Sequence, residues 1–545
     1  MSSVFATYVG QHMPVLPVLL PFFTGVGLLA WGDGGADPAL AAHKRAWARF
    51  VALSSVSLGL LVAIALVVRA SGGELMVYRV GDWPAAYGVA LLVDRLSAMM
   101  LLLTSLVAWP VLWYASAGWD ARGRHFHAIF QFQLMGLHGA FVTADLFNLF
   151  VFFEVLLVAS YALALHGLGR ERLRAGLHYV VMNLTASALF LVGVALLYGK
   201  VGTLNLADLA VRVPQIAAPD NAIVRAGGLI LLVVFGFKAA LLPLSMWLPA
   251  TYSAAGAPVA ALFALMTKVG VYAIVRVHGG VFAGDAATSA DWIPPVLLTL
   301  ALATSLVGVL GAMAAHTLER LVSWLTVASV GTVLAAIGLF SEAAWSAAFY
   351  YMANSTLVVA ALFLLAEVVA AQRGDAADRL EPASAVAQPA LLGVMLLLAA
   401  ASATGVPPLP GFIGKLMLLE AAESHRWQAA VWTVVLLVSF LTMIGLARAG
   451  SILFWHVRDT PDRTEPRAAV QPVAATWMLL AATVVMSVWA APIQSYVSAA
   501  ATQLGEREAY ARAMLGPLGS RTSTTRGAAS SKVSPPAGVR REVTR

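Results

Sequence analysis

Apolar runs of about 20 residues recur along this chain from Met13 to about Ala491, and short polar loops separate them. As a helix, each run is long enough to cross a hydrocarbon layer of roughly 30 Å. With 60% hydrophobic and only 11% charged residues, the chain is not a soluble globular enzyme. We therefore predict an all-α polytopic membrane protein with about 14 spans. The span centres are predicted near Gly25, Gly59, Leu103, Met135, Leu156, Leu189, Leu232, Leu265, Thr304, Ala328, Val359, Leu398 to Gly411 (one interrupted span), Val438 and Val484.

Lysine and arginine gather in alternate loops, and basic loops tend to remain cytoplasmic. Lys44, Arg122, Arg172 and Arg320 are examples from the more basic set. This pattern favours placing both termini outside, in the periplasm of a bacterium. The basic tail would then also lie outside, but its distance from the membrane weakens its effect on orientation. Its Ser, Thr, Gly, Pro and Arg content predicts disorder.

Composition also excludes several kinds of chemistry. The chain has no cysteine, so thiolate zinc sites, iron–sulfur clusters and disulfides within it are ruled out. It has neither a phosphate-binding loop nor a convincing dinucleotide fingerprint, so we expect no ATP, NADH or other cofactor. The net charge of +7 is spread over short loops, which argues against nucleic acid. His125 and His127 have no carboxylate or thiol beside them in the sequence, so we predict no metal site in this chain.

Ionisable residues inside the predicted spans are the strongest functional signal, since a charge at mid-membrane costs about 3 kcal/mol on insertion scales. Glu154 lies too far from either end of its span for a short carboxylate to reach water. Lys238 lies mid-span before Pro243, which lacks an N–H and leaves the carbonyl of Ala239 without its helical partner. Such a break is tolerated only where protein or water satisfies the backbone. We therefore expect a hydrated cavity beside Lys238, where a nearby carboxylate would make the lysine a proton-exchanging group.

Two further lysines follow the same logic. Lys268 lies in the next span, where snorkelling toward the membrane surface is the alternative. Lys415 follows a second unwound segment, "SATGVPPLPGFIGK", which contains Pro407, Pro408 and Pro410. Interrupted spans are typical of transporters whose ion sites lie at broken helices.

Uncharged polar residues could connect these lysines through water. Thr326 and Ser329 lie on one predicted span and Asn354 on the next. Interhelical hydrogen bonding explains them at least as well. His138 could relay protons at neutral pH, but a lone histidine in a bundle is more often structural. The segment "TLNLADLAVRV" (203–213) reads as a short amphipathic helix on the membrane surface.

Several of these stretches together resemble a known family. "LFNLFVFFEVLLVASYALALHG", "VFGFKAALLPLSMWLPATYSAAGAPVAALFALMTKVGVYAIVRV", "LERLVSWLTVASVGTVLAAIGL" and "GVPPLPGFIGK" are similar to the antiporter-like proton-translocating membrane proteins. These include the large membrane subunits of respiratory complex I and of multisubunit Mrp-type cation/proton antiporters. "GRHFHAIFQFQLMGLHGAFVTADLFNLFVFFEVLL" and "LARAGSILFWH" look most like the D subunits of the Mrp type.

The resemblance implies two inverted five-helix repeats, each with one broken helix, and a division into segments. These are 1–120 (first three helices), 121–280 (first repeat), 281–460 (second repeat), 461–500 (last helix) and 501–545 (basic tail). It also implies that Glu154 and Lys238 form a coupling ion pair, Lys268 is the central proton carrier and Lys415 the terminal proton site. Relatives often carry histidine or lysine where this chain has Ser329 and Asn354, so the path between Lys268 and Lys415 is expected to depend on water.

Our hypothesis from the sequence is a proton-translocating subunit of a monovalent cation (Na⁺ or K⁺)/proton antiporter in a bacterial inner membrane. It is not an enzyme, because no covalent chemistry is expected. Its partners would be other membrane subunits, one of which would bind the cation, since no carboxylate cluster here resembles a Na⁺ site. One alternative is a proton-pumping subunit of a quinone-reducing or hydrogenase-like complex. Another is a scaffold whose charges only fix helix packing.

Overall fold

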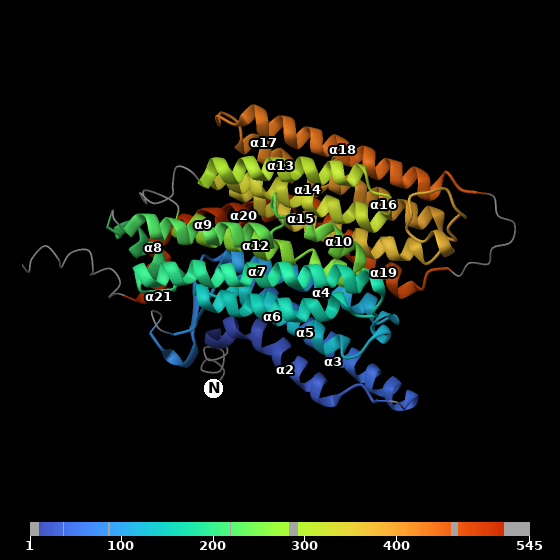
Figure 1. The fold of residues 1–545 in the computed structure, drawn as a ribbon, viewed down its shortest axis with the longest axis horizontal. Coiled ribbons are helices and arrows are strands. Elements are labelled where there is room, and N and C mark those ends of the chain that lie inside the picture. The colour runs from blue at the N-terminus through green and yellow to red at the C-terminus, as the bar shows by residue number, and fades with distance from the viewer. Residues whose placement is uncertain are drawn as a thin grey trace, which may run out of the picture.

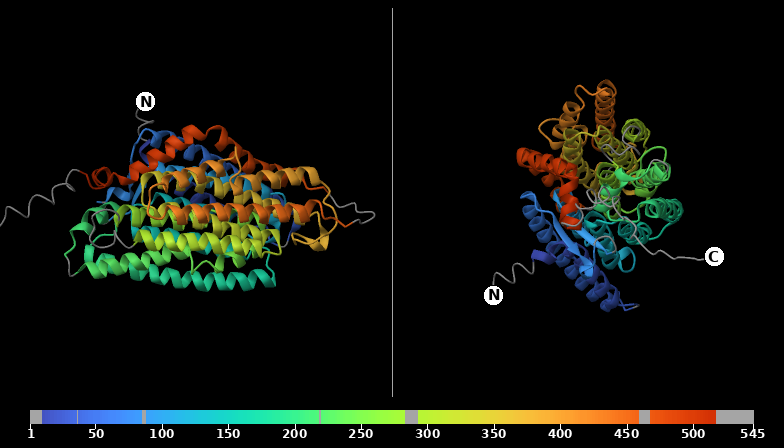
Figure 2. Two further views of the ribbon diagram at one scale, coloured as in Figure 1. Left: turned by 90° about the horizontal axis from the view of Figure 1, so that it is seen from above. Right: turned by 90° about the vertical axis from the view of Figure 1, so that its left-hand side faces the viewer.

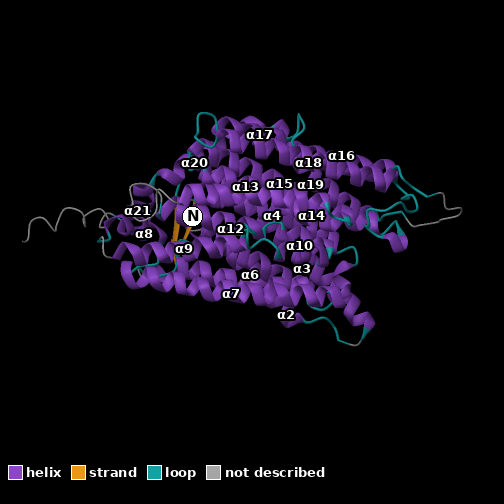
Figure 3. Cartoon of the chain, turned by 45° about the horizontal axis from the view of Figure 1, so that its top comes forward, coloured by secondary structure: helices purple, strands orange, loops and turns teal. Residues whose placement is uncertain are grey.

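The computed structural model describes residues 10–35, 37–84, 88–217, 220–282, 293–458 and 467–516. This part of the chain is a bundle of long helices with one small β-hairpin (Figure 1, Figure 3). The helices are α2 (Leu16–Trp31), α3 (Pro38–Ser71), α4 (Arg95–Ala115), α5 (Phe126–Val142), α6 (Leu146–Ala164), α7 (Arg170–Val201), α8 (Leu206–Arg212), α9 (Asn221–Lys238), α10 (Trp247–Ala254), α11 (Ala257–Phe263), α12 (Met266–Ile274), α13 (Ile293–Met313), α14 (Leu318–Gly338), α15 (Glu342–Ala370), α16 (Pro389–Thr404), α17 (Pro410–Ala421), α18 (Gln428–Phe454), α19 (Val470–Val488), α20 (Ala490–Gly505) and α21 (Arg507–Leu515). The strands are β1 (Met76–Arg79) and β2 (Ala90–Val93), and a π-helical turn, η6 (Val275–Val281), continues α12.

Within the described residues, 12 helices are long and apolar enough to cross a membrane. The two remaining predicted spans correspond to α5, with 17 residues, and to α16 followed by α17, with 16 and 12 residues. Helix α5 is one residue shorter than the shortest of those 12 helices, which has 18 residues, and the other span is divided into two half-helices. The all-α membrane fold predicted from the sequence is confirmed, and each predicted span centre falls on or between these elements.

Burial separates central helices from peripheral ones. The α11–α12–η6 span, α14 and α15 are almost entirely covered by other helices, whereas α2 and α3 leave most of their surface open. Figure 1 shows α2 and α3 along one edge of the bundle and α17 and α18 along the opposite edge. The outward faces of α2 and α3 are apolar, as a lipid-facing surface requires.

The first interruption lies between α9 and α10. Helix α9 ends at Lys238, and Ala240 adopts a positive φ of 59° where glycine usually terminates a helix. Protein groups satisfy the backbone released here: the indole of Trp247 donates to the carbonyl of Phe237 at 3.2 Å, and the hydroxyl of Thr304 on α13 accepts from the N–H of Leu242 at 2.9 Å. The predicted break before Pro243 is confirmed.

The second interruption lies between α16 and α17. Helix α16 ends at Thr404, where Gly405 takes the left-handed conformation with φ 86°, and α17 begins at Pro410. Proline suits this position, since the first residue of a helix has no intrahelical partner for its N–H. Pro408 lies in the linker between the two half-helices. The structure therefore contains both predicted broken spans; the inverted symmetry between them stays a prediction.

One end of the bundle is covered by short elements: the β-hairpin, α8, α20 and α21 (Figure 2, Figure 3). The hairpin pairs Met76 with Val93 and Arg79 with Ala90 in antiparallel register. Segment 203–213 does form a helix, α8, which packs on α21 and η6 with Leu209 buried. Its placement on the membrane surface stays a prediction.

The expected boundary of the disordered tail at residue 501 is wrong, because α20 continues to Gly505 and α21 to Leu515. Helix α20 has a buried apolar stripe, Val497, Ala501 and Leu504, and α21 buries Met514, which the tail's average composition conceals. The low-complexity stretch from residue 519 onward lies outside the described residues.

A buried ion pair fastens this same end. Arg276 in η6 binds Asp94, the N-cap of α4, through two hydrogen bonds of 2.6 and 2.5 Å, and Tyr510 of α21 donates to the same carboxylate. Burial by itself would raise the pKa of Asp94, but the Arg276 charge and hydrogen bonds hold the pKa well below its ordinary range. The carboxylate thus remains charged and ties three distant segments together.

Candidate functional site

Lys238, the last residue of α9, is buried and its ammonium is hydrogen-bonded to a neutral side chain. Nζ donates to Oδ1 of Asn183 on α7 at 2.9 Å, and the rings of Phe153 and Phe237 lie 5.9 Å from the same nitrogen. Asn183 is oriented by its own donation to the carbonyl of Tyr179 at 2.9 Å. The lysine does not snorkel to the surface; it is held inside the bundle by α7.

Glu154 on α6 accepts a short hydrogen bond from the hydroxyl of Ser187, which is also on α7. Ser187 and Asn183 are four residues apart and therefore project from the same face of that helix. The expected direct ion pair between Glu154 and Lys238 is not formed: each charge contacts its own partner on α7. Two polar residues on one face of α7 thus bond the carboxylate and the amine separately.

Asn183 and Ser187 were not among the site residues predicted from the sequence. The sequence does contain a pattern that marks them, since "NLTAS" places an amide and a hydroxyl four residues apart inside an apolar span. The same helix also carries Thr185, which is exposed and hydrogen-bonded to its own helix. Only knowledge of which face of α7 meets α6 and α9 separates the two cases.

Lys268 on α12 is fully buried, with 0% of its surface exposed. Its one described side-chain hydrogen bond is weak, a 3.4 Å approach of Nζ to the hydroxyl of Thr267. Gly270, two residues on, allows α12 to lie directly against the end of α9: a Cβ there would be 2.5 Å from the backbone nitrogen of Ala239. The helix that carries Lys268 is therefore in close backbone contact with the end of α9 that carries Lys238. Because Lys268 is fully buried, its side chain does not snorkel to the membrane surface.

Lys415 on α17 reaches back across the second interruption. Its Nζ donates to the carbonyls of Ala403 and Thr404 at 3.1 and 2.9 Å, and to the hydroxyl of Ser439 on α18 at 2.9 Å. Those carbonyls are at the C-terminal end of α16, where the helix dipole favours a cation. Three oxygens thus surround the buried amine.

A small cavity of about 30 Å³ adjoins Lys415. Ser329 of α14, Asn354 of α15 and Tyr351 line it with the lysine. A space of about 10–15 Å³ by this measure already accommodates a water molecule, so this cavity has room for one or more. Oδ1 of Asn354 accepts from Ser402 at 2.8 Å, while its Nδ2 is buried without a protein partner among the described residues. The structure therefore brings two of the predicted relay residues to Lys415.

The other two predicted relay residues have structural contacts. The hydroxyl of Thr326 donates to the carbonyl of Val322 at 2.9 Å, within its own helix. Nδ1 of His138 lies 2.8 Å from the carbonyl of Pro17 and so connects α5 to α2. For these two residues the contacts match the hydrogen-bonding interpretation.

The histidines near the α4–α5 connection also have protein partners. Nε2 of His127 lies 2.9 Å from Oδ2 of Asp120, and the backbone N–H of His125 donates to Asp33 at 2.7 Å. Within the described ranges, no three His, Asp or Glu side chains gather as metal ligands would.

Comparison with known proteins gives consistent matches. Residues 143–445 match a family described as NADH:quinone oxidoreductase/Mrp antiporter, transmembrane. The D subunit of a probable K⁺/H⁺ antiporter from Rhizobium meliloti is 39% identical, covering 91% of this chain and 96% of that protein. The D subunit of a Na⁺/H⁺ antiporter from Alkalihalophilus pseudofirmus is 34% identical, covering 93% and 99%.

Solved structures extend the comparison to the fold. A chain of the Mrp complex from Dietzia sp. superimposes with a TM-score of 0.83 at 27% identity, covering 93% of this chain and 100% of that one. A chain of respiratory complex I from Thermus thermophilus gives a TM-score of 0.73 at 23% identity, covering 90% and 99%. The second likeness supports the fold alone.

Proposed function

The chain belongs to the NADH:quinone oxidoreductase/Mrp antiporter membrane family, and from that premise we propose that it moves protons in a multisubunit monovalent cation/proton antiporter. It acts as a transporter component, comparable with the antiporter D subunits it resembles, rather than as an enzyme. The other subunits of the complex are its partners, and the exchanged cation is Na⁺ or K⁺.

One observation carries this proposal: three lysines and one glutamate lie within the membrane-spanning bundle, and none of the four is neutralised by an opposite charge within salt-bridge distance in the described part of the chain. Unpaired charge inside a protein is costly. A structural role would be served as well by apolar side chains. A proton pathway, by contrast, needs ionisable groups inside the membrane, because each must gain and lose a proton.

The arrangement suggests how the charges communicate. Glu154 and Lys238 bond separately to Ser187 and Asn183, so a small movement of α6 or α9 relative to α7 changes their separation. A closer carboxylate favours the ammonium form of the lysine, and a more distant one favours release of the proton. The proton then passes to Lys268 and, through water molecules, to the cavity at Lys415. Pro243, Pro408 and Pro410 maintain the breaks that allow this hydration.

We further propose that both termini face the periplasm of a bacterial inner membrane. Figure 1 shows the α2–α3 connection and the C-terminal end of α18 at one end of the bundle, with α8 and α21 at the other. The first end carries the more basic loops, as a cytoplasmic face does. The chain lacks cysteine, so a single cysteine at Ala121 or at Ser71 can be labelled without background. A membrane-impermeant maleimide applied to intact cells should label Ser71→Cys and spare Ala121→Cys; the reverse pattern would overturn this orientation.

Replacing Glu154 by Gln tests the function. The expected result is loss of cation-dependent proton movement in everted vesicles, with normal assembly of the complex. The matched control is Glu423→Gln, which removes an exposed carboxylate after α17 and should preserve activity. Exchange at the parental rate in the Glu154 variant would refute the proposal.

A proton-pumping subunit of a quinone-reducing complex remains the second candidate, because the matched family spans both kinds of protein. The identity to antiporter D subunits along nearly the whole chain favours the first. Purification of the tagged chain separates them: small membrane subunits of an antiporter support our proposal, and flavin- or iron–sulfur-bearing partners support the other.

A further inference from the structure

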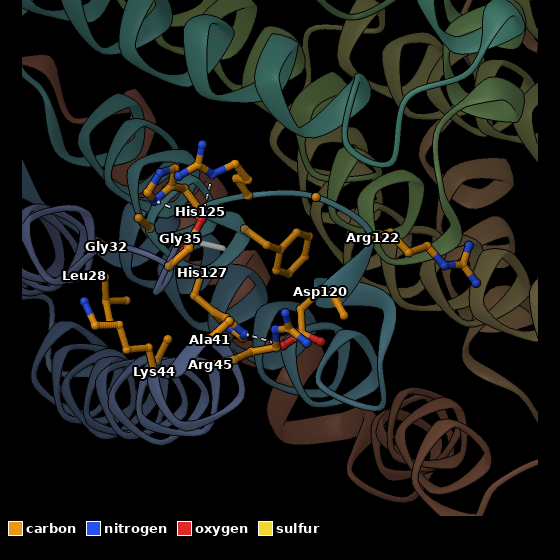
Figure 4. A pocket seen from close by; sticks show the side chains of 17 residues that line it. Leu28, Gly32, Gly35, Ala41, Lys44, Arg45, Asp120, Arg122, His125 and His127 are labelled. Carbon is orange, nitrogen blue, oxygen red and sulfur yellow. Dashed lines mark hydrogen bonds and ion pairs between the residues drawn. The ribbon is translucent and has the colours of Figure 1, made fainter. Parts of the chain in front are cut away.

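A basic cavity lies at the end of the bundle opposite α8 and α21, between the α2–α3 connection and the start of α5. Its volume is about 480 Å³ (Figure 4). Lys44 and Arg45 of α3, Arg124 and the two histidines at the start of α5 line it, together with Asp33 and Asp120. None of these residues belongs to the proton path described above.

The acidic groups of this cavity are already engaged. Asp120 binds Arg49 through two hydrogen bonds of 2.7 Å and also contacts His127. Asp33 accepts the backbone N–H of His125 at 2.7 Å. Two of the bases are less occupied: Arg45 has no side-chain hydrogen bond or ion pair in the described part of the chain, and Arg124 lies 3.8 Å from Asp33 and is mostly exposed. Lys44 donates to the carbonyl of Trp31 at 2.6 Å, which leaves its charge without a counter-ion among the described residues. The cavity thus has an excess of positive charge.

Arg122 does not add to this excess. It pairs with Glu367 at 3.2 Å and lies over the ring of Trp119, and Figure 4 shows it turned away from the other labelled side chains. Nδ1 of His127, a residue that lines the cavity and is 4% exposed, is buried without a protein partner among the described residues.

The surroundings indicate which anion would fit. Trp31, at the end of α2, and Trp47 and Phe50, in the first half of α3, are about half exposed or more. Exposed tryptophans at helix ends mark the interface between lipid tails and water. Beyond them the outward faces of α2 and α3 are apolar, with Phe23, Leu58 and Leu61 open to the surroundings. A positive cavity is therefore continuous with a lipid-facing surface.

We propose that this cavity binds the phosphate headgroup of an anionic phospholipid whose acyl chains lie along α2 and α3. Basic pockets between membrane helices are suited to such headgroups, and each nearby Lys or Arg strengthens attraction to an anionic surface. The lipid fastens the peripheral α2–α3 pair, which is otherwise the least covered part of the bundle.

Photo-crosslinking of the intact complex in phosphatidylcholine vesicles tests this. The probe is phosphatidylglycerol with a photoreactive group on its headgroup, and a phosphatidylcholine probe with the same group is the neutral comparison. We expect the anionic probe to label residues 31–49 or 120–128 and the neutral probe to label them weakly. Lys44→Gln with Arg45→Gln should reduce labelling roughly tenfold or more.

Arg170→Gln with Arg174→Gln is the matched control, since it removes two exposed charges from the start of α7, outside the cavity, and should leave labelling unchanged. If the double variant fails to assemble, Arg45→Gln alone and competition by unlabelled phosphatidylglycerol on the parental complex give the same test. Equal labelling by both probes, undiminished labelling in the variant, displacement by inorganic phosphate instead of lipid, or a crosslink from the cavity to another subunit would each overturn the proposal.

Discussion

Asn183 accepts a hydrogen bond from Lys238 at 2.9 Å, and one turn further along α7 Ser187 donates to Glu154. A single helix face therefore bonds both the partly buried carboxylate and the first buried amine. This relationship replaces the direct ion pair expected from the family resemblance. It makes α7 the element that sets how strongly the two charges interact.

Replacing Asn183 by Leu should slow antiport by roughly tenfold to a hundredfold, because the loss of a hydrogen bond to a buried charge costs roughly 1.5–3 kcal/mol. Initial rates of cation-induced proton movement in everted vesicles measure this. Thr185→Val on the same helix is the control, since Thr185 is exposed and bonded to its own backbone. Equal rates for the Asn183 variant and the parental complex would remove α7 from the mechanism.

Replacing Lys415 by Gln should abolish antiport, whereas Ser439→Ala should slow it only a few-fold. The reason is that the carbonyls of Ala403 and Thr404 still hold the amine when the hydroxyl is removed. The same vesicle measurement compares the two. A serine variant as inactive as the lysine variant would mean that Ser439, and not the amine at the helix end, is the essential group.

Gly270→Ala should destabilise the complex by about 1–3 kcal/mol, the usual cost of overpacking. The new methyl would meet the backbone of α9 at 2.5 Å and push α12 away from it. Gly199→Ala is the matched control, because a Cβ there meets nothing within 4 Å. Thermal unfolding in detergent, followed by tryptophan fluorescence, should show a lower midpoint for the first variant only.

Asp120→Asn should lower stability at neutral pH by on the order of 2 kcal/mol. Burial would raise the pKa of Asp120, but the hydrogen bonds from Arg49 and His127 bring the pKa from 3.8 down to about 2. A carboxyl with a depressed pKa stabilises the fold fully above its ordinary pKa, and this contribution is lost as pH falls toward the folded value. The difference in thermal midpoint between parental and variant complexes should therefore be constant above about pH 5 and shrink below about pH 4.

Asp375→Asn, an exposed loop carboxylate, is the control for that comparison and should match the parental midpoint throughout. A difference for Asp120→Asn that persists unchanged at the lowest pH reached would show that the carboxylate acts by packing and not by charge.

Sequence patterns predicted the features that depend on local chemistry. Apolar runs located the spans, and Pro243 and the proline cluster at 407–410 located both breaks, because a residue without an N–H weakens the helix around it. Lys238, Lys268 and Lys415 were identified because charge within an apolar run is conspicuous. Features that depend on which helix faces pack together were missed. Asn183 and Thr185 are both polar residues of α7, and only the packing of α7 shows that the first is buried and the second exposed. Helix α21 was missed for a similar reason, since its single buried apolar residue, Met514, does not show in the composition of a basic tail.

The pairing of Glu154 shows the same limit. Family resemblance implied Lys238 as the partner of this carboxylate, and the structure supplies Ser187 of α7 instead. Likewise, the relay residues divided by position. Ser329 and Thr326 both donate to carbonyls of their own helix, but only Ser329, with Asn354, lines the cavity at Lys415.

Lys268 gives the most direct test of the central claim that buried amines carry protons. It is fully buried, and its only described side-chain hydrogen bond is a 3.4 Å approach to Thr267, so Lys268→Met removes a charge without removing a strong contact. We predict that proteoliposomes containing the assembled Lys268→Met complex, studied on a solid-supported membrane, give no cation-driven proton current while the complex unfolds at the parental temperature or above. A parental current from that variant would contradict the account.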